Sequence, residues 1–273
     1  MTDRQKVSIW FLARSLLLQV RPVSVTAQSL QKNTKPGLHM NIATSSRRKG
    51  FTLVELLVVI AIIVALAALA TPQIFRALKR AAMAEAVSNA KQVKLALDGF
   101  AMDFDGQFPN EDTAEDVVEG GTGTTYSNDF FRQLFLSGVT ESEIIFWVKN
   151  SPAAGSNSAP DDKVKEGGRM QPQEILQDGD VHWAYISEQT NLDTTSRPLL
   201  IDGYQKNTSE WDPDLWENKV IVVRIDGSTK AMRMRLSDGK VLDGSKNDIL
   251  SSQADAWDGD SPSDLLKQPQ PGS

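Results

Sequence analysis

A single acidic side chain, Glu55, lies within an otherwise apolar run of the sequence. Residues 51–70 contain only one other polar residue, Thr52. As a helix rising about 1.5 Å per residue, this run would cross the roughly 30 Å hydrocarbon layer of a bilayer. An ionised carboxylate near its start is costly unless it is paired, neutral or close to an interface. Cleavage between Gly50 and Phe51 would create an α-ammonium group about one helical turn away, which could neutralise Glu55 on the same chain or on a neighbouring one.

Residues 50–60 resemble the N-terminal processing signature of type IV pilins and type II secretion pseudopilins. The resemblance extends over about twenty residues after Gly50 and includes Pro72, where the family often has a helix-bending proline. It implies that a prepilin peptidase cleaves after Gly50 and methylates the Phe51 amine, and that Glu55 helps to dock the subunit into a filament. The partners that it implies are other pilin-like subunits, of the same or a different kind, the prepilin peptidase and an inner-membrane assembly platform.

A basic cluster, Arg47-Arg48-Lys49, directly precedes the apolar run. Basic flanks of membrane helices stay on the cytoplasmic side. We therefore expect a single pass through the inner (cytoplasmic) membrane, with the N-terminus in the cytoplasm and the C-terminal domain in the periplasm or otherwise outside the cytoplasm. After assembly the protein is expected in a filament.

Two other interpretations of the apolar run stay open. It could be an ordinary single-pass anchor in which Glu55 has no role. It could also belong to a secretory signal peptide, with a small-residue cleavage site at 65–67 or 68–70. The acid inside the run and Pro72 just beyond the site argue against a signal peptide. Either alternative would make the protein an exported binding domain, membrane-anchored or released by cleavage, rather than a filament subunit.

The segment Asp103-Phe104-Asp105-Gly106-Gln107-Phe108-Pro109 resembles the turn that follows the long helix in major pseudopilins. Together with an acidic domain and the absence of the C-terminal cysteine pair of adhesive pilins, this favours a type II secretion pseudopilin. Asp103 and Asp105 could be the first ligands of a calcium-binding loop, but the third acid and the terminal glutamate of an EF-hand loop are missing. We therefore predict a turn here. No cofactor is expected; calcium stays open, with no ligands assigned.

Several other side chains could in principle catalyse a reaction. His182 might be paired with Ser187, and carboxylates are available nearby in sequence, but no nucleophile elbow, phosphate loop or histidine spacing typical of a metal site fixes their geometry. The chain has two histidines and no cysteine. We predict no enzyme and no metal site; the carboxylates considered were Asp202, Asp212, Asp214 and Asp226.

The two sides of the predicted cleavage point differ strongly in charge. Residues 1–50 hold nine of the 29 basic side chains but only one of the 35 acidic ones, so the remainder carries 20 basic and 34 acidic side chains. Binding to phosphate backbones requires a basic face. The exported part is therefore not expected to bind nucleic acid.

We expect residues 1–50 to form a leader. Family leaders are short, and translation from Met40 would leave one of eleven residues, with 1–39 as an untranslated extension. One helix is predicted from residue 51 to about 102, because apolar and small residues recur every three or four positions. Residues 51–72 would be its membrane and assembly half, and residues 73–104 its periplasmic half.

The remaining residues predict a pilin-like α+β fold, in which the long helix packs on a small antiparallel sheet of three or four strands. Residues 105–247 would form this globular domain, and the polar residues 248–273 a disordered tail. Within the domain we expect a loop over 111–125, a short helix capped by 127–129 and ending near Gly138, a surface excursion over 151–169, and strands over 181–187, 198–202, 219–226 and 229–236.

Overall fold

The computed structural model describes residues 51–119, 121–155, 158–166, 169–172, 174–257 and 259–272. The predicted leader, with Gly50 and the candidate start Met40, lies outside the described residues. Residues from Val54 onward form one compact unit, and the description below concerns this unit.

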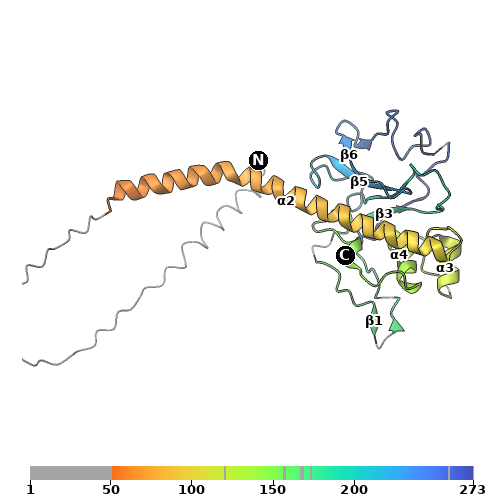
Figure 1. Cartoon of the computed structure of the whole chain (residues 1–273). Helices are drawn as coiled ribbons and strands as arrows, with labels where there is room; N and C mark the ends of the chain where they lie inside the picture. The colour runs from red at the N-terminus through yellow and green to blue at the C-terminus, as the bar shows by residue number, and fades with distance from the viewer. Residues whose placement is uncertain are drawn as a thin grey trace, which may run out of the picture. The chain divides into compact units, whose positions relative to one another are not determined.

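A single helix of 51 residues, α2 (Leu53–Asp103), organises the fold and confirms the predicted long helix (Figure 1). Its second half is rich in alanine, the strongest helix former. The helix ends where Asp105 and Gly106 enter the left-handed region, with φ values of 49° and 84°. The Gly106 N–H donates to the Ala101 carbonyl at 2.8 Å, which closes the last turn. The turn predicted after the helix is therefore confirmed.

The two halves of α2 differ in their surroundings. Every residue from Phe51 to Ala81 is exposed, whereas a stripe beginning near Ala82 packs into the main core. The stripe recurs at the spacing of one helix face. Its fully buried members include Ala90, Val93, Leu97 and Phe100.

An antiparallel sheet of six strands, in the order β7-β6-β5-β4-β3-β8, packs on this stripe and confirms the α+β layout. It has more strands than the three or four expected. The four predicted strand regions all form strands. Their bounds are β3 (Trp183–Ile186), β4 (Pro198–Asp202), β5 (Lys219–Arg224) and β6 (Thr229–Arg235), and the edges are β7 (Lys240–Val241) and β8 (Leu266–Lys267).

Both faces of the sheet are covered. In β5, Ile221 and Val223 face the core shared with α2, whereas Val220 and Val222 pack in a second cluster with Trp211. Burial on both faces explains why this strand is a continuous apolar run rather than an alternating one. The sheet thus fixes the second half of α2 in a closed core.

Two expectations about short helices need correction. The loop predicted over 111–125 contains a helix, α3 (Glu111–Val117), whose first turn is capped by Asn110. The Asn110 Oδ1 accepts from the Thr113 N–H at 2.8 Å, and the Thr113 hydroxyl oxygen accepts from the Asn110 N–H at 2.9 Å. Such reciprocal bonds stabilise a helix start that has no apolar periodicity. The prediction of a loop was wrong because this cap was overlooked.

The predicted helix around residue 130 is present as α4 (Ser127–Leu136). Its N-cap position is Tyr126 rather than one of residues 127–129, and Asp129, inside the first turn, accepts from the Tyr126 N–H at 2.9 Å. The excursion over 151–169 is not wholly on the surface, since Ala153 and Ala154 are buried. Its end forms part of a small hairpin of β1 (Lys165–Glu166) and β2 (Arg169–Met170). Before it in the chain lies a 3₁₀ turn, η1 (Ile144–Phe146).

The disordered tail predicted for 248–273 is wrong for its described residues. Trp257 is fully buried, and its indole N–H donates to the Ile249 carbonyl at 2.8 Å. Further on, β8 adds to the edge of β3. A few apolar anchors therefore order a segment whose overall composition is polar.

Candidate functional site

The predicted processing and assembly residues lie at the start of α2. Gly50 lies outside the described residues. Phe51 is 73% exposed and lies two residues before the first residue of the helix, and Glu55 is an exposed residue of the first helical turn. A carboxylate is favoured there because the N-terminus of a helix carries partial positive charge. The fold therefore leaves the Glu55 side chain on a helical segment that the domain does not cover.

The apolar half of α2 has no cover within the described chain. An 18-residue window has a mean hydropathy of 3.0 and none of it is buried, so the residues that the structure describes include one helix long and apolar enough to cross a membrane. Contiguous apolar surface of this extent marks a membrane or protein contact. Side chains more than half exposed include Leu53, Leu57, Ile63, Val64, Leu66 and Leu69.

Pro72 lies inside α2, which continues through it. Proline cannot donate the backbone hydrogen bond of its position and crowds the preceding turn. Next to it, the Thr71 hydroxyl donates to the Ala67 carbonyl at 2.7 Å, a contact that often accompanies helix bending. A bend at Pro72 stays a prediction.

His182 lies in a buried network with two partners. Its Nε2 is 2.8 Å from the Asp202 carboxylate, and its Nδ1 is 2.7 Å from the Ser151 hydroxyl. A serine, a histidine and an aspartate in contact are the components of a hydrolase triad. The structure thus joins two residues considered in the sequence, His182 and Asp202, with a serine that had not been considered.

The surroundings of this triad show a structural role. All three side chains are buried, the Ser151 oxygen also accepts from the Ala154 N–H at 3.0 Å, and the second Asp202 oxygen accepts from the Ile221 N–H at 2.7 Å. A Cβ at Gly203 would lie 2.6 Å from the His182 carbonyl oxygen. The three side chains therefore lie inside the packed domain. The network ties the 151–155 turn to β4 and β5.

The other catalytic candidates are not brought to His182. The Ser187 hydroxyl donates to the Leu265 carbonyl at 3.2 Å. Asp212 accepts from the Asp214 N–H, and Asp226 accepts from the Ser228 N–H, so these acids form local turns. Within the part of the chain that the structure describes, no three His, Cys, Asp or Glu side chains are grouped in a way that could hold a metal ion. The structure consequently assigns no calcium ligands.

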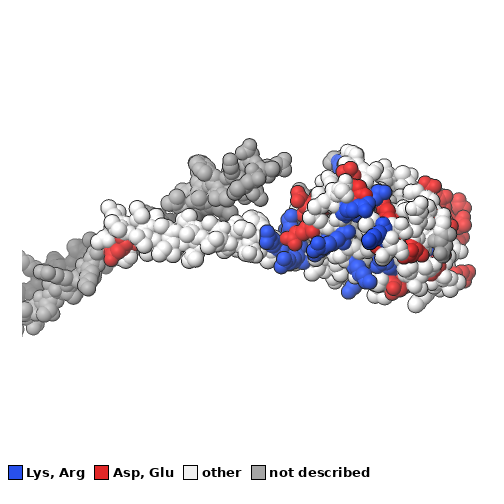
Figure 2. All heavy atoms as spheres, turned by 90° about the horizontal axis from the view of Figure 1, so that it is seen from above, with Lys and Arg blue, Asp and Glu red and all other residues white. Residues whose placement is uncertain are grey.

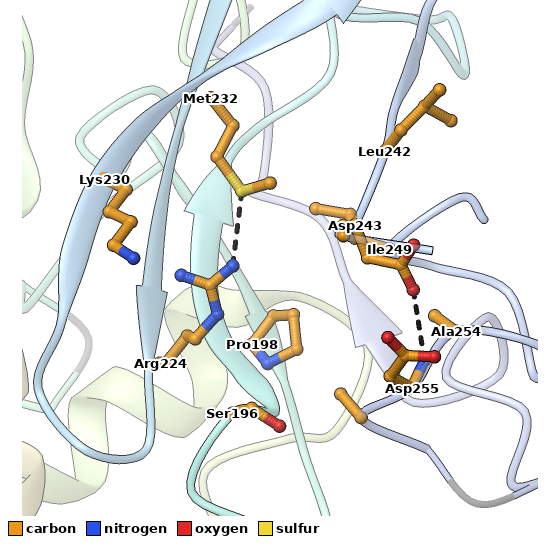
Figure 3. Close-up of a pocket in the computed structure, with 12 residues that line it drawn as sticks. Ser196, Pro198, Arg224, Lys230, Met232, Leu242, Asp243, Ile249, Ala254 and Asp255 are labelled. Atoms are coloured by element: carbon orange, nitrogen blue, oxygen red, sulfur yellow. Dashed lines mark hydrogen bonds between the residues drawn. The ribbon is translucent and has the colours of Figure 1, made fainter. Parts of the chain in front are cut away.

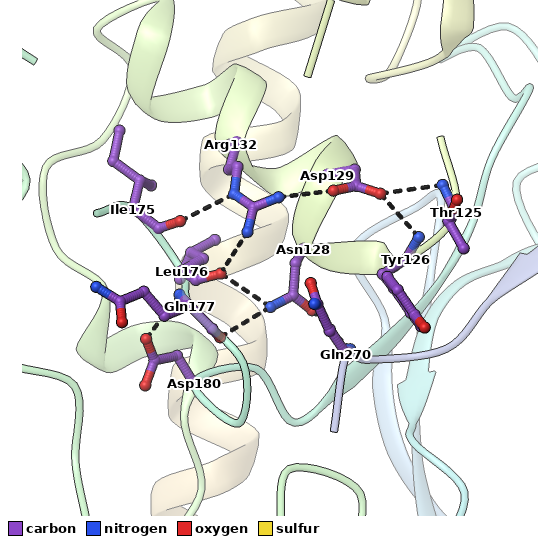
Figure 4. A network of polar contacts seen from close by, with 10 residues as sticks. All are labelled: Thr125, Tyr126, Asn128, Asp129, Arg132, Ile175, Leu176, Gln177, Asp180 and Gln270. Atoms are coloured by element: carbon purple, nitrogen blue, oxygen red, sulfur yellow. Dashed lines mark hydrogen bonds and ion pairs between the residues drawn. The ribbon is translucent and has the colours of Figure 1, made fainter. Parts of the chain in front are cut away.

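A second polar network links the start of α4 to the end of the chain (Figure 4). Arg132 donates to Asp129 at 2.6 Å and to the carbonyls of Ile175 and Leu176 at 2.9 and 3.0 Å. Asn128 accepts from the Gln270 N–H at 2.9 Å. These bonds hold the C-terminal segment against α4, which is how the domain keeps its last residues in place.

An open groove of about 420 Å³ lies beside β6 (Figure 3). Arg224 and Lys230 line one side, and Asp243 and Asp255 line the other. The Arg224 guanidinium donates to the Met232 sulfur at 3.4 Å. The volume lies in the range of ligand pockets, so the groove could hold a small ligand between its basic and acidic sides.

Comparison with known families gives one match, which covers the predicted cleavage point and the first part of α2. Residues 45–71 match the family described as the prokaryotic N-terminal methylation motif, the signature of type IV pilins and pseudopilins. The match contains Gly50, Phe51 and Glu55 and ends one residue before Pro72. No match was found among curated proteins or among solved structures. The chain therefore carries a pilin-type motif on a long helix with a small antiparallel sheet.

Proposed function

We propose that this pilin-like protein is a pseudopilin of a type II secretion system, cleaved after Gly50, methylated on the Phe51 amine and assembled through the first half of α2. The observation that carries the proposal is the coincidence of the methylation motif with the uncovered half of the helix. The motif implies processing by a prepilin peptidase and assembly into a pilus-like filament. The acidic domain and the turn at 103–109 support the secretion system over an adhesive pilus.

The proposed mechanism is transfer of one surface between two environments. Before assembly, the apolar half of α2 lies in the inner membrane, with the N-terminus in the cytoplasm and the domain outside. On extraction, that surface leaves lipid and must pack on the helices of other subunits, because water cannot replace lipid around it. Cleavage supplies the ammonium group with which Glu55, on the same or a neighbouring subunit, forms an ion pair.

Replacement of Glu55 tests the assembly role. Glu55→Ala and Glu55→Gln are expected to lower the filament fraction, sedimented from gently lysed cells, at least tenfold, while the protein stays in the membrane fraction. Glu85→Ala is the matched control, since Glu85 is an exposed acid on the packed half of the same helix. Filaments formed in normal amounts by both Glu55 variants would refute the role of this residue.

The alternative, an exported binding domain held by an ordinary anchor, is favoured by the groove at Arg224. Deletion of the gene separates the two functions. The pseudopilin proposal predicts that proteins normally released through the secretion system accumulate inside the cell. Unchanged release with unchanged surface pili would instead indicate the exported binding domain, and unchanged release with loss of surface pili would indicate an adhesive pilin.

A further inference from the structure

Basic side chains gather where the uncovered half of α2 meets the domain. Exposed Arg76 and Arg80 are one turn apart on the helix, and Lys79 donates to the Asp214 carbonyl, which brings the loop before β5 against α2. Lys219, at the start of β5, lines the same depression as Lys79 and Arg80. We name the resulting set the basic collar; with the cross-strand neighbour of Lys219 it comprises Arg76, Lys79, Arg80, Lys219 and Arg233.

The described residues do not neutralise the collar. Among the described residues, none of its five members forms an ion pair with a carboxylate. Glu217 is the acid that lines the depression beside them. Five cations outnumber the two acidic residues beside them, Glu217 and Asp214, and so leave a positive surface on a domain whose overall charge is strongly negative.

Acidic side chains gather at the other end of the packed half of α2. There the turn after the helix, α3 and the loop around residue 188 lie together, since the Phe108 N–H donates to the Gln189 carbonyl at 3.1 Å. The charges are close enough that Glu111 and Asp112 help to raise the pKa of Glu188, after burial as the main cause. We name this set the acidic end; it comprises Asp105, Glu111, Asp112, Glu115, Asp116 and Glu188, all exposed.

We propose that the basic collar of one subunit docks on the acidic end of a second copy of this chain. The inference rests on the proposed filament and names one of its contacts. Figure 2 shows Lys and Arg where the helix enters the domain and Asp and Glu towards the opposite end. Like the collar, the acidic end has no ion pair within the described chain. The two surfaces are therefore complementary and both available.

The geometry of this contact allows it to repeat. About 27 residues of α2 separate the collar from the acidic end, which corresponds to an axial offset of roughly 40 Å between the two copies. A contact between two different surfaces of identical chains does not close into a dimer but propagates into a ring or a helical filament. A subunit can meet one neighbour through its apolar half and another through its charges.

Anionic lipid headgroups are the other class of partner that a basic collar next to a membrane helix could contact. Two observations favour the second copy. Lys219 and Arg233 extend the collar from the helix onto the sheet, and the same chain supplies an acidic surface whose charge is opposite in sign and similar in magnitude. Lipid would account for the collar but would leave the acidic end without a role.

Reciprocal charge reversal tests the proposal in the full chain. Arg80→Glu with Arg233→Glu, and separately Glu115→Arg with Asp116→Arg, are each expected to reduce the filament fraction sedimented from gently lysed cells at least tenfold. Co-expression of the two variants should restore assembly to within about threefold of the unmodified protein, since each variant then meets its complement. Lys149→Glu and Asp178→Arg, exposed residues outside both surfaces, are the matched controls. Thermal unfolding in detergent verifies that all variants are folded.

Cysteine cross-linking provides a second measurement, because the chain has no cysteine of its own. Arg80→Cys combined with Glu115→Cys in one chain should give a ladder of disulfide-linked multimers on oxidation, whereas Lys149→Cys with Asp178→Cys should give none. The proposal would be overturned if the collar variant lost assembly, the acidic-end variant assembled normally and co-expression did not restore assembly of the collar variant. That result would indicate lipid contact. Unmodified protein that forms no filaments refutes the proposed function; filaments insensitive to both reversals refute only this inference.

Discussion

The two halves of α2 have the same backbone conformation but opposite relations to the rest of the molecule. Residues before Ala82 are exposed, including the large apolar side chains Leu57 and Ile63. Beyond it, Leu97 and Phe100 are fully buried against the sheet. One half is stabilised by contacts inside the chain. The other is an apolar surface whose contacts must come from lipid or from other chains.

This difference separates folding from assembly along one helix. A substitution in the packed half acts on the stability of the domain, and a substitution in the uncovered half acts on insertion or on filament formation. The basic collar lies at the boundary between the two. Substitutions in the two halves should therefore differ in their effect on domain stability, from a large loss in the packed half to almost none in the uncovered half.

Phe100→Ala should destabilise the domain most. The ring is fully buried and stacks on Phe104, with centroids 4.0 Å apart. Removing it leaves a cavity, and the free energy of unfolding should fall by about 3–5 kcal/mol. Thermal or denaturant unfolding of the full chain in detergent measures this loss. The matched control is Leu57→Ala, for which stability should stay unchanged; an equal loss in both would show that the halves are not separate.

Asp202→Asn should cost about 2–3 kcal/mol of unfolding free energy, because it removes the charge that His182 contacts in a buried site. Ser151→Ala should cost about 1 kcal/mol, since the hydroxyl bonds to both His182 and Ala154. Denaturant unfolding gives both values. A hydrolytic activity in the purified protein that Ser151→Ala abolishes would contradict the structural role of the triad.

Glu143 makes the stability of the domain depend on pH. Burial raises the pKa of its carboxyl from 4.5 to about 6, partly offset by the hydrogen bond from the Leu176 N–H. A raised folded-state pKa means that the folded protein holds this proton more tightly than the unfolded chain. The stabilisation of the folded domain by protonated Glu143 is therefore present below about pH 4.5 and is lost as the pH rises through about 6.

In Glu143→Gln, whose amide oxygen can still accept from the Leu176 N–H, this loss should disappear. The unmodified protein should lose about 1–2 kcal/mol between pH 4 and pH 7 relative to the variant. Unfolding curves recorded at several pH values give the comparison. Parallel pH profiles for the two proteins would show that Glu143 does not titrate as described.

Pro72→Ala should have the smallest effect on the domain. The residue lies in the uncovered half, so the free energy of unfolding should change by less than about 0.5 kcal/mol, although proline costs about 3 kcal/mol in the interior of an isolated helix. Unfolding in detergent checks this. A stabilisation of several kcal/mol would mean that the uncovered half unfolds together with the domain.

Much of the architecture could be predicted from the sequence because its signals are local. The helix shows as a repeat of three to four residues, and the strands as short apolar runs between turns. The proposed processing and assembly residues, Phe51 and Glu55, likewise lie within one short motif. These features do not depend on which distant segments meet.

The features that could not be predicted depend on contacts between distant segments or on single anchors. Ser151 and His182 are 31 residues apart, and no sequence pattern predicts their contact. Helix α3 is a short polar sequence stabilised by Asn110, and the C-terminal segment is ordered by Trp257 despite its polar composition. The basic collar was missed for the first reason, because Lys219 joins α2 only in the folded chain.

The mass and N-terminal sequence of the mature protein test the central claim most directly. If the uncovered half of α2 is a processed assembly segment, the purified membrane or filament protein begins at Phe51 and carries one methyl group on its amine. A mature protein that begins at Thr71, or one that keeps residues 41–50, would contradict this account.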